Sequence, residues 1–173
     1  EVIEGNYYAA GTTIEINGTV NGDIFVAGNT IVIDSENING DIFAAGSSIT
    51  IKGKVNGSLR LVGENIDLLG EVSRNSMVAG QNFRLDSDAK VAGHLTFWGQ
   101  MLSVAGEVGR LEGAFENLRL SGIVNNDVDI YLSTNKAKDN LNISDDASIG
   151  GTLYYKALKK LDINSQATIG NVS

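Results

Sequence analysis

The strongest structural restriction in this sequence is a repeat of 17 to 18 residues. Two consecutive copies occupy residues 20–37 and 38–54, and they read VNGDIFVAGNTIVIDSEN and INGDIFAAGSSITIKGK. Apolar residues fall at offsets 0, 4, 6, 11 and 13 from the leading Val or Ile, and the 4/6 and 11/13 pairs have the period of two that is typical of a half-buried β-strand. A unit this short cannot bury its own apolar side, so the copies must stack on one another.

The repeat keeps its register through almost the whole chain. After a first copy that begins at Ile3, the leading residues are Val20, Ile38, Val55, Val72, Val91, Val108, Val124, Ile149 and Ile169. The pairs at offsets 11 and 13 are Ile14/Ile16, Ile31/Ile33, Ile49/Ile51, Ile66/Leu68, Phe83/Leu85, Leu102/Val104, Leu118/Leu120, Leu141/Ile143 and Leu161/Ile163. Once stacked, these pairs should form one continuous inner wall. The sequence therefore predicts an all-β, single-domain parallel β-helix (β-solenoid) of about nine coils over residues 1–173.

The glycines form two columns in this register. The first column lies two residues after the leading residue, as at Gly22 and Gly40, and we expect it to hold turn residues with positive φ. Arg74 and Arg110 interrupt it, so we expect a local change of backbone there. The second column should mark the corner after the first strand of each coil, and it consists of Gly11, Gly28, Gly46, Gly63, Gly80 and Gly99.

The late coils, residues 108–173, are less regular than the early ones. Phe115, Leu132 and Ala157 replace the second glycine column there, and the copy that begins at Val108 is one residue short. The polar stretch at 132–140, LSTNKAKDN, predicts an insertion that bulges out of the solenoid as a loop.

Charge is distributed unevenly along the chain, whose net charge is −8. Residues 1–51 contain seven acidic residues and no Lys or Arg, whereas residues 52–173 contain 14 acidic and 13 basic residues. This asymmetry fits either ordinary solubility or an end-to-end polarity that is used in assembly. An acidic surface without a basic stripe argues against a nucleic-acid partner.

The composition also restricts cysteine chemistry and membrane insertion. Without cysteine the chain has no disulfide framework and no thiolate metal site. No apolar run reaches the roughly 18 residues that a membrane-spanning helix needs. Because the chain begins at Glu1 rather than Met, we expect a processed start from which a signal peptide has been removed.

Enzymatic solenoids offer a poor match to this pattern. Left-handed hexapeptide acyltransferases have an aliphatic residue at every sixth position and a catalytic His, but the single His here, His94, shares a column with the turn residues Asn6, Asp23 and Asp41. We expect these side chains to bond their own backbone in turns. Asp23 and Asp41 stack about 5 Å apart and would make at most a weak cation site. No P-loop, G-x-S-x-G or H-E-x-x-H motif occurs, so we expect no enzyme, no cofactor and no metal.

One column of outward-facing residues is aromatic and is a candidate interaction site. Strand alternation places offset 5 outside, where Tyr8, Phe25 and Phe43 follow one another at the acidic end. Contiguous exposed apolar surface usually marks an interaction site. The strip is therefore a candidate site for a partner, with burial under a loop or a preceding segment as the alternative.

The recurrent phrases VNGDIFVAG, INGDIFAAG and VNGSLRLVG, with IEINGT and ITIKGK between them, resemble those of the bactofilins and related polymer-forming β-helical proteins. The resemblance covers nearly the whole chain and is greatest to secreted or membrane-anchored relatives. It implies a right-handed parallel β-helix that assembles end to end without nucleotide. It also implies the cell envelope or the extracellular space, in association with a membrane, with the cytoplasm as the alternative.

The sequence and this resemblance lead to one functional hypothesis and one alternative. The hypothesis is a structural scaffold that polymerises with itself through its terminal coils, alongside a component linked to the cell envelope or membrane. The alternative is a surface or cell-wall module that binds glycan or protein through the aromatic strip. The N-terminal contact residues would be Val2, Ile3, Tyr7, Ile14 and Ile16. The C-terminal contact residues would be Leu153, Tyr155, Lys156, Lys159, Lys160, Leu161, Ile163 and Ile169.

Overall fold

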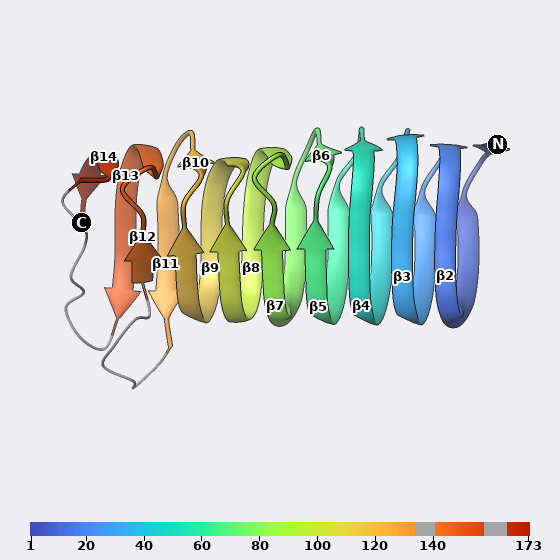
Figure 1. The fold of residues 1–173 in the computed structure, drawn as a ribbon, viewed down its shortest axis with the longest axis horizontal. Coiled ribbons are helices and arrows are strands. Elements are labelled where there is room, and N and C mark those ends of the chain that lie inside the picture. The colour runs from blue at the N-terminus through green and yellow to red at the C-terminus, as the bar shows by residue number, and fades with distance from the viewer. Residues whose placement is uncertain (134–140, 158–165) are drawn as a thin grey trace.

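The chain folds into a single stack of coils with its two ends at opposite ends of the long axis (Figure 1). The computed structural model describes residues 1–133, 141–157 and 166–173. No helix occurs among these residues, and hence none that could cross a membrane. The strands are β1 (Val2–Glu4), β2 (Tyr7–Asn21), β3 (Ile24–Ile38), β4 (Ile42–Val55), β5 (Leu59–Leu68), β6 (Glu71–Val72), β7 (Ser76–Leu85), β8 (Lys90–Val104), β9 (Glu107–Leu120), β10 (Ile123–Val124), β11 (Val128–Leu132), β12 (Leu141–Ile143), β13 (Ser148–Ala157) and β14 (Thr168–Val172).

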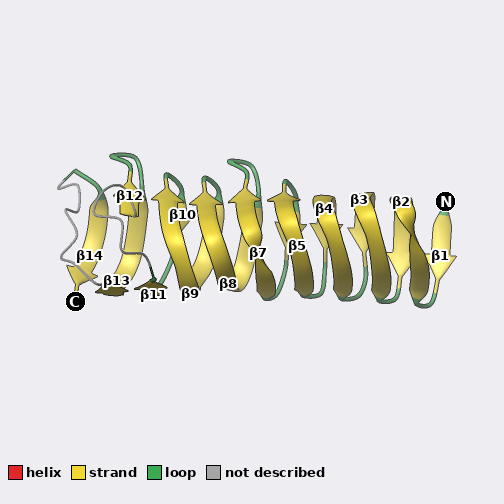
Figure 2. Cartoon of the chain, turned by 90° about the horizontal axis from the view of Figure 1, so that it is seen from below, coloured by secondary structure: helices red, strands yellow, loops and turns green. Residues whose placement is uncertain are grey.

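Neighbouring coils pair in parallel, residue on equivalent residue. Between β3 and β4 the pairs fall in three runs, at residues 24–28, 30–35 and 37–38 of β3. Ile31 pairs with Ile49, and Ile49 with Ile66, which is the register that the repeat predicts. The parallel β-solenoid of about nine turns is thus confirmed, and Figure 2 shows the same succession of coils from another side.

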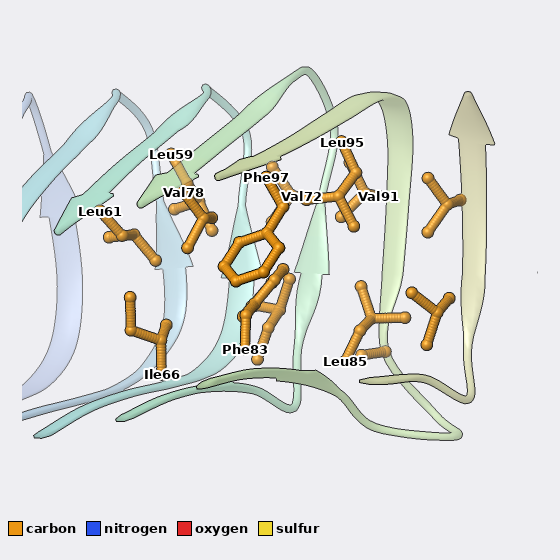
Figure 3. Close-up of a cluster of buried hydrophobic side chains, with 14 of the residues drawn as sticks. Leu59, Leu61, Ile66, Val72, Val78, Phe83, Leu85, Val91, Leu95 and Phe97 are labelled. Carbon is orange, nitrogen blue, oxygen red and sulfur yellow. The ribbon is translucent and has the colours of Figure 1, made fainter. Parts of the chain in front are cut away.

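The inner wall predicted from offsets 11 and 13 is part of the core, together with the buried residues at offsets 0, 4 and 6. Every pair from Ile14/Ile16 to Leu141/Ile143 is buried, while Leu161/Ile163 lie outside the described residues. Three phenylalanines fill the middle of the stack. Phe97 lies between Phe83 and Phe115, with ring centroids 5.9 and 5.8 Å apart, and Figure 3 shows Phe83 and Phe97 side by side inside the coils.

The expectation of positive φ for the first glycine column is wrong for most of its members. Within that column Gly5 has a φ of 92°, but Gly22, Gly40 and Gly57 are not among the glycines with positive φ. A Cβ on Gly40 would instead collide with the carbonyl of Gly22 in the preceding coil. These glycines are therefore required by the close approach of successive backbones, not by a left-handed turn.

In the late coils the strand pairing is irregular at the positions where the sequence repeat is irregular. Val91 and Val108 pair, but the next pair is His94 with Arg110, so the missing residue is absorbed at this corner. Gly99 pairs with Phe115 at the end of the second glycine column. Leu132 pairs with Phe115 and Leu141 with Leu118, so the register resumes after the polar stretch. Most of that stretch, 134–140, lies outside the described residues.

Candidate functional site

The N-terminal end of the solenoid leaves part of its core uncovered. Ile3, Tyr7 and Ala9 pack against the core but are only partly buried, and Val2 is 60% exposed. The first run of β2 pairs with β3 on one side only, so alternate N–H and C=O groups face outward. Of the predicted N-terminal contact residues, Ile14 and Ile16 lie inside the chain's own core. The surface available to a partner is thus formed mainly by Val2, Ile3 and Tyr7.

Gly11 at this end differs from the other glycines of its column. A Cβ on Gly28 would collide with the Gly11 carbonyl, and one on Gly46 with the Gly28 carbonyl. A Cβ on Gly11 itself would meet nothing closer than the Thr13 carbonyl, at 3.9 Å. Its φ is not positive either, so neither backbone conformation nor packing within the described chain requires glycine there. The direction in which that Cβ would point is the one from which a further coil would approach.

The C-terminal end is covered more unevenly. Leu153 is fully buried because it pairs with Val172 of β14. Tyr155 and Ile169 are partly buried against the core, and Lys156 is exposed. The other predicted contact residues, Lys159, Lys160, Leu161 and Ile163, lie outside the described residues.

The uneven distribution of charge along the sequence is also a difference between the two ends of the stack. Among the described residues the inter-coil ion pairs begin at Lys52, whose Nζ lies 3.2 Å from Asp34. Later coils add Arg84 to Asp67 at 2.8 Å and Lys90 to Glu107 at 3.0 Å. The first coil contains Glu1, Glu4 and Glu15 and no base. The acidic end of the sequence is therefore also the N-terminal end of the stack.

The column of Asp23 and Asp41 is a hydrogen-bonded ladder. Oδ1 of Asn6 accepts from the Asp23 backbone N–H at 2.9 Å, and Oδ1 of Asp23 accepts from the Asp41 N–H at 2.8 Å. The same pattern links Asn75 to the His94 N–H at 2.9 Å. Each side-chain oxygen thus accepts from a backbone N–H of the next coil. The expectation that these side chains bond their own backbone is therefore wrong. No cluster of three or more potential metal ligands occurs in the described part of the chain.

A second ladder was not foreseen from the sequence. The amide Nδ2 of Asn39 donates to Asn21 at 2.7 Å, and that of Asn56 donates to Asn39 at 2.6 Å. Asn21 in turn donates to Glu4 Oε1 at 2.8 Å. The recurrence of N-G after Val20, Ile38 and Val55 was the available signal, because parallel in-register coils place identical amides one above the other.

The aromatic strip stacks face to face along the solenoid. The ring centroids of Tyr8 and Phe25 lie 5.0 Å apart and those of Phe25 and Phe43 lie 4.7 Å apart, with interplanar angles of 7° and 8°. The guanidinium of Arg60 caps the Phe43 ring at 4.9 Å from its centroid. A sugar stacks on an open aromatic face, but Phe25 is covered by Tyr8 and Phe43, and Phe43 by Phe25 and Arg60. Of the three rings Tyr8, which is 68% exposed, keeps one uncovered face, so the geometry does not favour the glycan-binding alternative.

Beside this strip runs a shallow groove that sequence reasoning missed. It has a volume of about 800 Å³ and crosses the coils from Tyr8 to Trp98. Its floor is the outward column at offset 7, which reads Ala10, Ala27, Ala45, Val62 and Ala79. Met77 beside this floor is 45% exposed, and Trp98, which pairs with Ala79 at the end of the floor column, is 44% exposed. The sequence feature that could have indicated this groove is the column of small residues at offset 7 beside the aromatic column at offset 5.

The fold and its ends define a class of protein: a parallel β-solenoid whose apolar core is incompletely covered at both ends of the described stack. A family model for bactofilins, described as polymer-forming cytoskeletal, matches residues 1–96. As the match spans more than half of the chain, the chain belongs to the bactofilin family. No match was found among curated proteins or among solved structures.

Proposed function

We propose that the protein is a structural scaffold that polymerises end to end through its terminal coils. The observation that carries the proposal is the location of the partly buried core residues. Within the described chain these are Ile3, Tyr7 and Ala9 at one end and Tyr155, Ala157, Ala167 and Ile169 at the other. Stacking a terminal coil on that of a second copy would bury these side chains and pair the outward backbone groups. Gly11 supports the same contact because it leaves room for a coil to approach.

Charge favours some end contacts over others. Two N-terminal ends would bring Glu1, Glu4 and Glu15 against the same residues of a second copy, and like charges repel. The sequence of the last coil contains Lys156, Lys159 and Lys160 beside one acid, Asp162. Head-to-tail contact, or contact between two C-terminal ends, is therefore favoured over contact between two N-terminal ends.

The scaffold needs no chemical step to assemble. Backbone pairing and burial of apolar surface supply the free energy of association, so we propose assembly without nucleotide and without catalytic activity. We place the scaffold at the cell envelope or outside the cell, associated with a membrane-linked component, with the cytoplasm as the other compartment. Fractionation of the producing cells with an antibody to the chain distinguishes the two.

The test of assembly uses the space beside Gly11. Gly11→Val adds a side chain whose Cβ points toward an approaching coil and lies 3.9 Å from its nearest neighbour within the described chain, the Thr13 carbonyl oxygen. We expect this variant to keep the melting temperature of the parent and to lose filaments, measured by light scattering and electron microscopy with and without ATP. Thr12→Val, at the adjacent exposed position, is the matched control and should assemble like the parent. Normal assembly of Gly11→Val, or a parent that stays monomeric at high concentration, would refute end-to-end stacking through this coil.

A further inference from the structure

The groove is long, apolar and poor in hydrogen-bonding groups. It extends over six successive coils, from Tyr8 to Trp98, which at the spacing of paired strands is about 24 Å. The polar side-chain groups among its lining residues are the Arg60 guanidinium, the Tyr8 hydroxyl and the Trp98 indole N–H. Since Val62 is 59% exposed on the floor and Met77 and Trp98 are also exposed, the groove is open to a ligand in the described structure.

The backbone beneath the groove offers little to an extended peptide. Each interior strand of this face pairs with a coil on both sides, as β3 does with β2 and β4. An extended segment lying in the groove would press its own N–H and C=O groups against alanine and aromatic side chains without partners, which costs free energy. A helix satisfies its backbone internally, and about 16 helical residues match a length of about 24 Å. The groove therefore suits an amphipathic helix with one apolar face.

The charge around the groove determines which charge the polar face of that helix should carry. Asp23 and Asp41 lie two residues before the aromatic residues Phe25 and Phe43, and residues 1–98, which include all six coils of the groove, contain 12 acidic and 6 basic residues. The one cation of the lining, Arg60, is already held by Asp41 at 2.9 Å and stacked on Phe43. A basic helix is thus attracted, whereas a second copy of this acidic chain and an anionic lipid surface are repelled.

We propose that this groove docks a basic amphipathic helix of a partner protein onto the side of the scaffold. The groove runs along the side of the stack, whereas the proposed polymer contacts are made through its ends, so a docked helix and a polymer are compatible. It also predicts that partners line a filament at the spacing of its subunits.

Trp98, the sole tryptophan, reports occupancy because it lies at one end of the groove. The probe is a synthetic helical peptide of about 16 residues with leucines on one face and lysines on the other, and its control has glutamates in place of the lysines. Titration into the Gly11→Val variant, which keeps assembly out of the measurement, should shift the Trp98 emission to the blue with the Lys peptide only. Ala45→Arg fills the floor with a like charge and should weaken binding roughly tenfold or more. Thr50→Arg, in the outward column at offset 12, should leave it unchanged.

Each other result overturns the proposal. Equal shifts with the Lys and Glu peptides, or equal affinities for parent and Ala45→Arg, would mean that the groove does not select a basic helix. A shift with phosphatidylcholine or phosphatidylglycerol vesicles and none with the peptide would assign the groove to a lipid surface. A concentration-dependent shift of the protein alone, with a dimer in sedimentation, would assign it to a second copy.

Discussion

Glycine in this solenoid is selected mainly by the distance between coils. Gly46 has no side chain because the carbonyl of Gly28 occupies the position that its Cβ would take. The equivalent position in the first coil, Gly11, has no such neighbour in the part of the chain that the structure describes.

The two glycines therefore predict opposite results for the same substitution. Gly46→Ala should destabilise the fold by about 1–3 kcal/mol, because the added methyl group forces two paired backbones apart. Gly11→Ala should leave the unfolding free energy close to that of the parent. Urea unfolding of both variants under non-assembling conditions provides the comparison, and equal losses would show that coil spacing is not the reason for the column.

Ser76 is an exception in the core. It occupies the column of Ile42, Leu59 and Leu95, it is fully buried, and its hydroxyl has no hydrogen-bond partner among the described residues. Ser76→Ala removes the unsatisfied group at almost constant volume, so we expect a gain of about 1 kcal/mol. Thermal unfolding measures it, and Thr50→Ala on the outside serves as the control. A loss of stability would indicate that the hydroxyl is satisfied in solution.

Core positions could be predicted from the sequence, whereas the reason for the glycines could not. Period-two pairs such as Ile31/Ile33 have one physical meaning, a strand with one buried side. A recurrent glycine has two, positive φ or close approach of another backbone, and the sequence does not distinguish them. Only the coordinates show that Gly40 is of the second kind.

At the scale of elements, side-chain ladders link the turns of successive coils. Asp41 joins two of these links, because its Oδ1 accepts from the Ser58 N–H at 2.8 Å and its Oδ2 from Arg60 at 2.9 Å. The Ser58 N–H, which has the largest effect, and the Arg60 guanidinium hold the pKa of the Asp41 carboxyl below its usual value, against the opposing effect of burial. A carboxylate with a lowered folded-state pKa stabilises the fold above its unfolded pKa, and this contribution is lost as the pH falls through the folded-state pKa.

Asp41→Asn separates these contributions. The amide oxygen still accepts from the Ser58 N–H, but the charge that pairs with Arg60 is gone. We expect the variant to melt below the parent at neutral pH and to lose less stability than the parent on acidification to about pH 3. Melting curves at both pH values test this, with Asp34→Asn, which pairs only with the exposed Lys52, as the comparison. An identical pH dependence in parent and Asp41→Asn would show that Asp41 contributes nothing to acid sensitivity.

The aromatic strip shows where sequence reasoning ends at this scale. Alternation alone predicts that Tyr8, Phe25 and Phe43 lie outside in one column, and they do. The groove depends in addition on small side chains in the neighbouring column at offset 7. It also depends on Trp98, the residue of that column in the sixth coil, which closes the far end. A concave surface is a property of adjacent columns considered together, which a search for apolar residues at single offsets does not detect.

Across the whole molecule, regularity decreases from the N-terminal end to the C-terminal end. The family match ends at residue 96, shortly before the second glycine column ends at Gly99 and the shortened coil begins at Val108. The later coils take larger corner residues, such as the buried Phe115 and Leu132, and the polar stretch after them. The regular coils carry the acidic end, the groove and the open N-terminal edge, so the features proposed to mediate association lie mostly in the part of the chain that matches the family.

Hydrogen exchange tests the end contact and its polarity in one experiment. In the isolated chain residues 7–11 pair with β3 alone: the Tyr7 N–H already donates to the Asp23 carbonyl, whereas the alternate N–H groups that face outward have no partner coil and should exchange readily. The amides of Ile31–Ile33 lie between two coils and should already be protected. Assembly should add protection at residues 7–11 and little in the middle of β3. Head-to-tail contact should also protect β14, while contact between two C-terminal ends should protect β14 and leave residues 7–11 unchanged. Gly11→Val should abolish the gain at the N-terminal edge. Uniform protection along the stack, or protection confined to the outward aromatic face, would show that copies associate side by side instead.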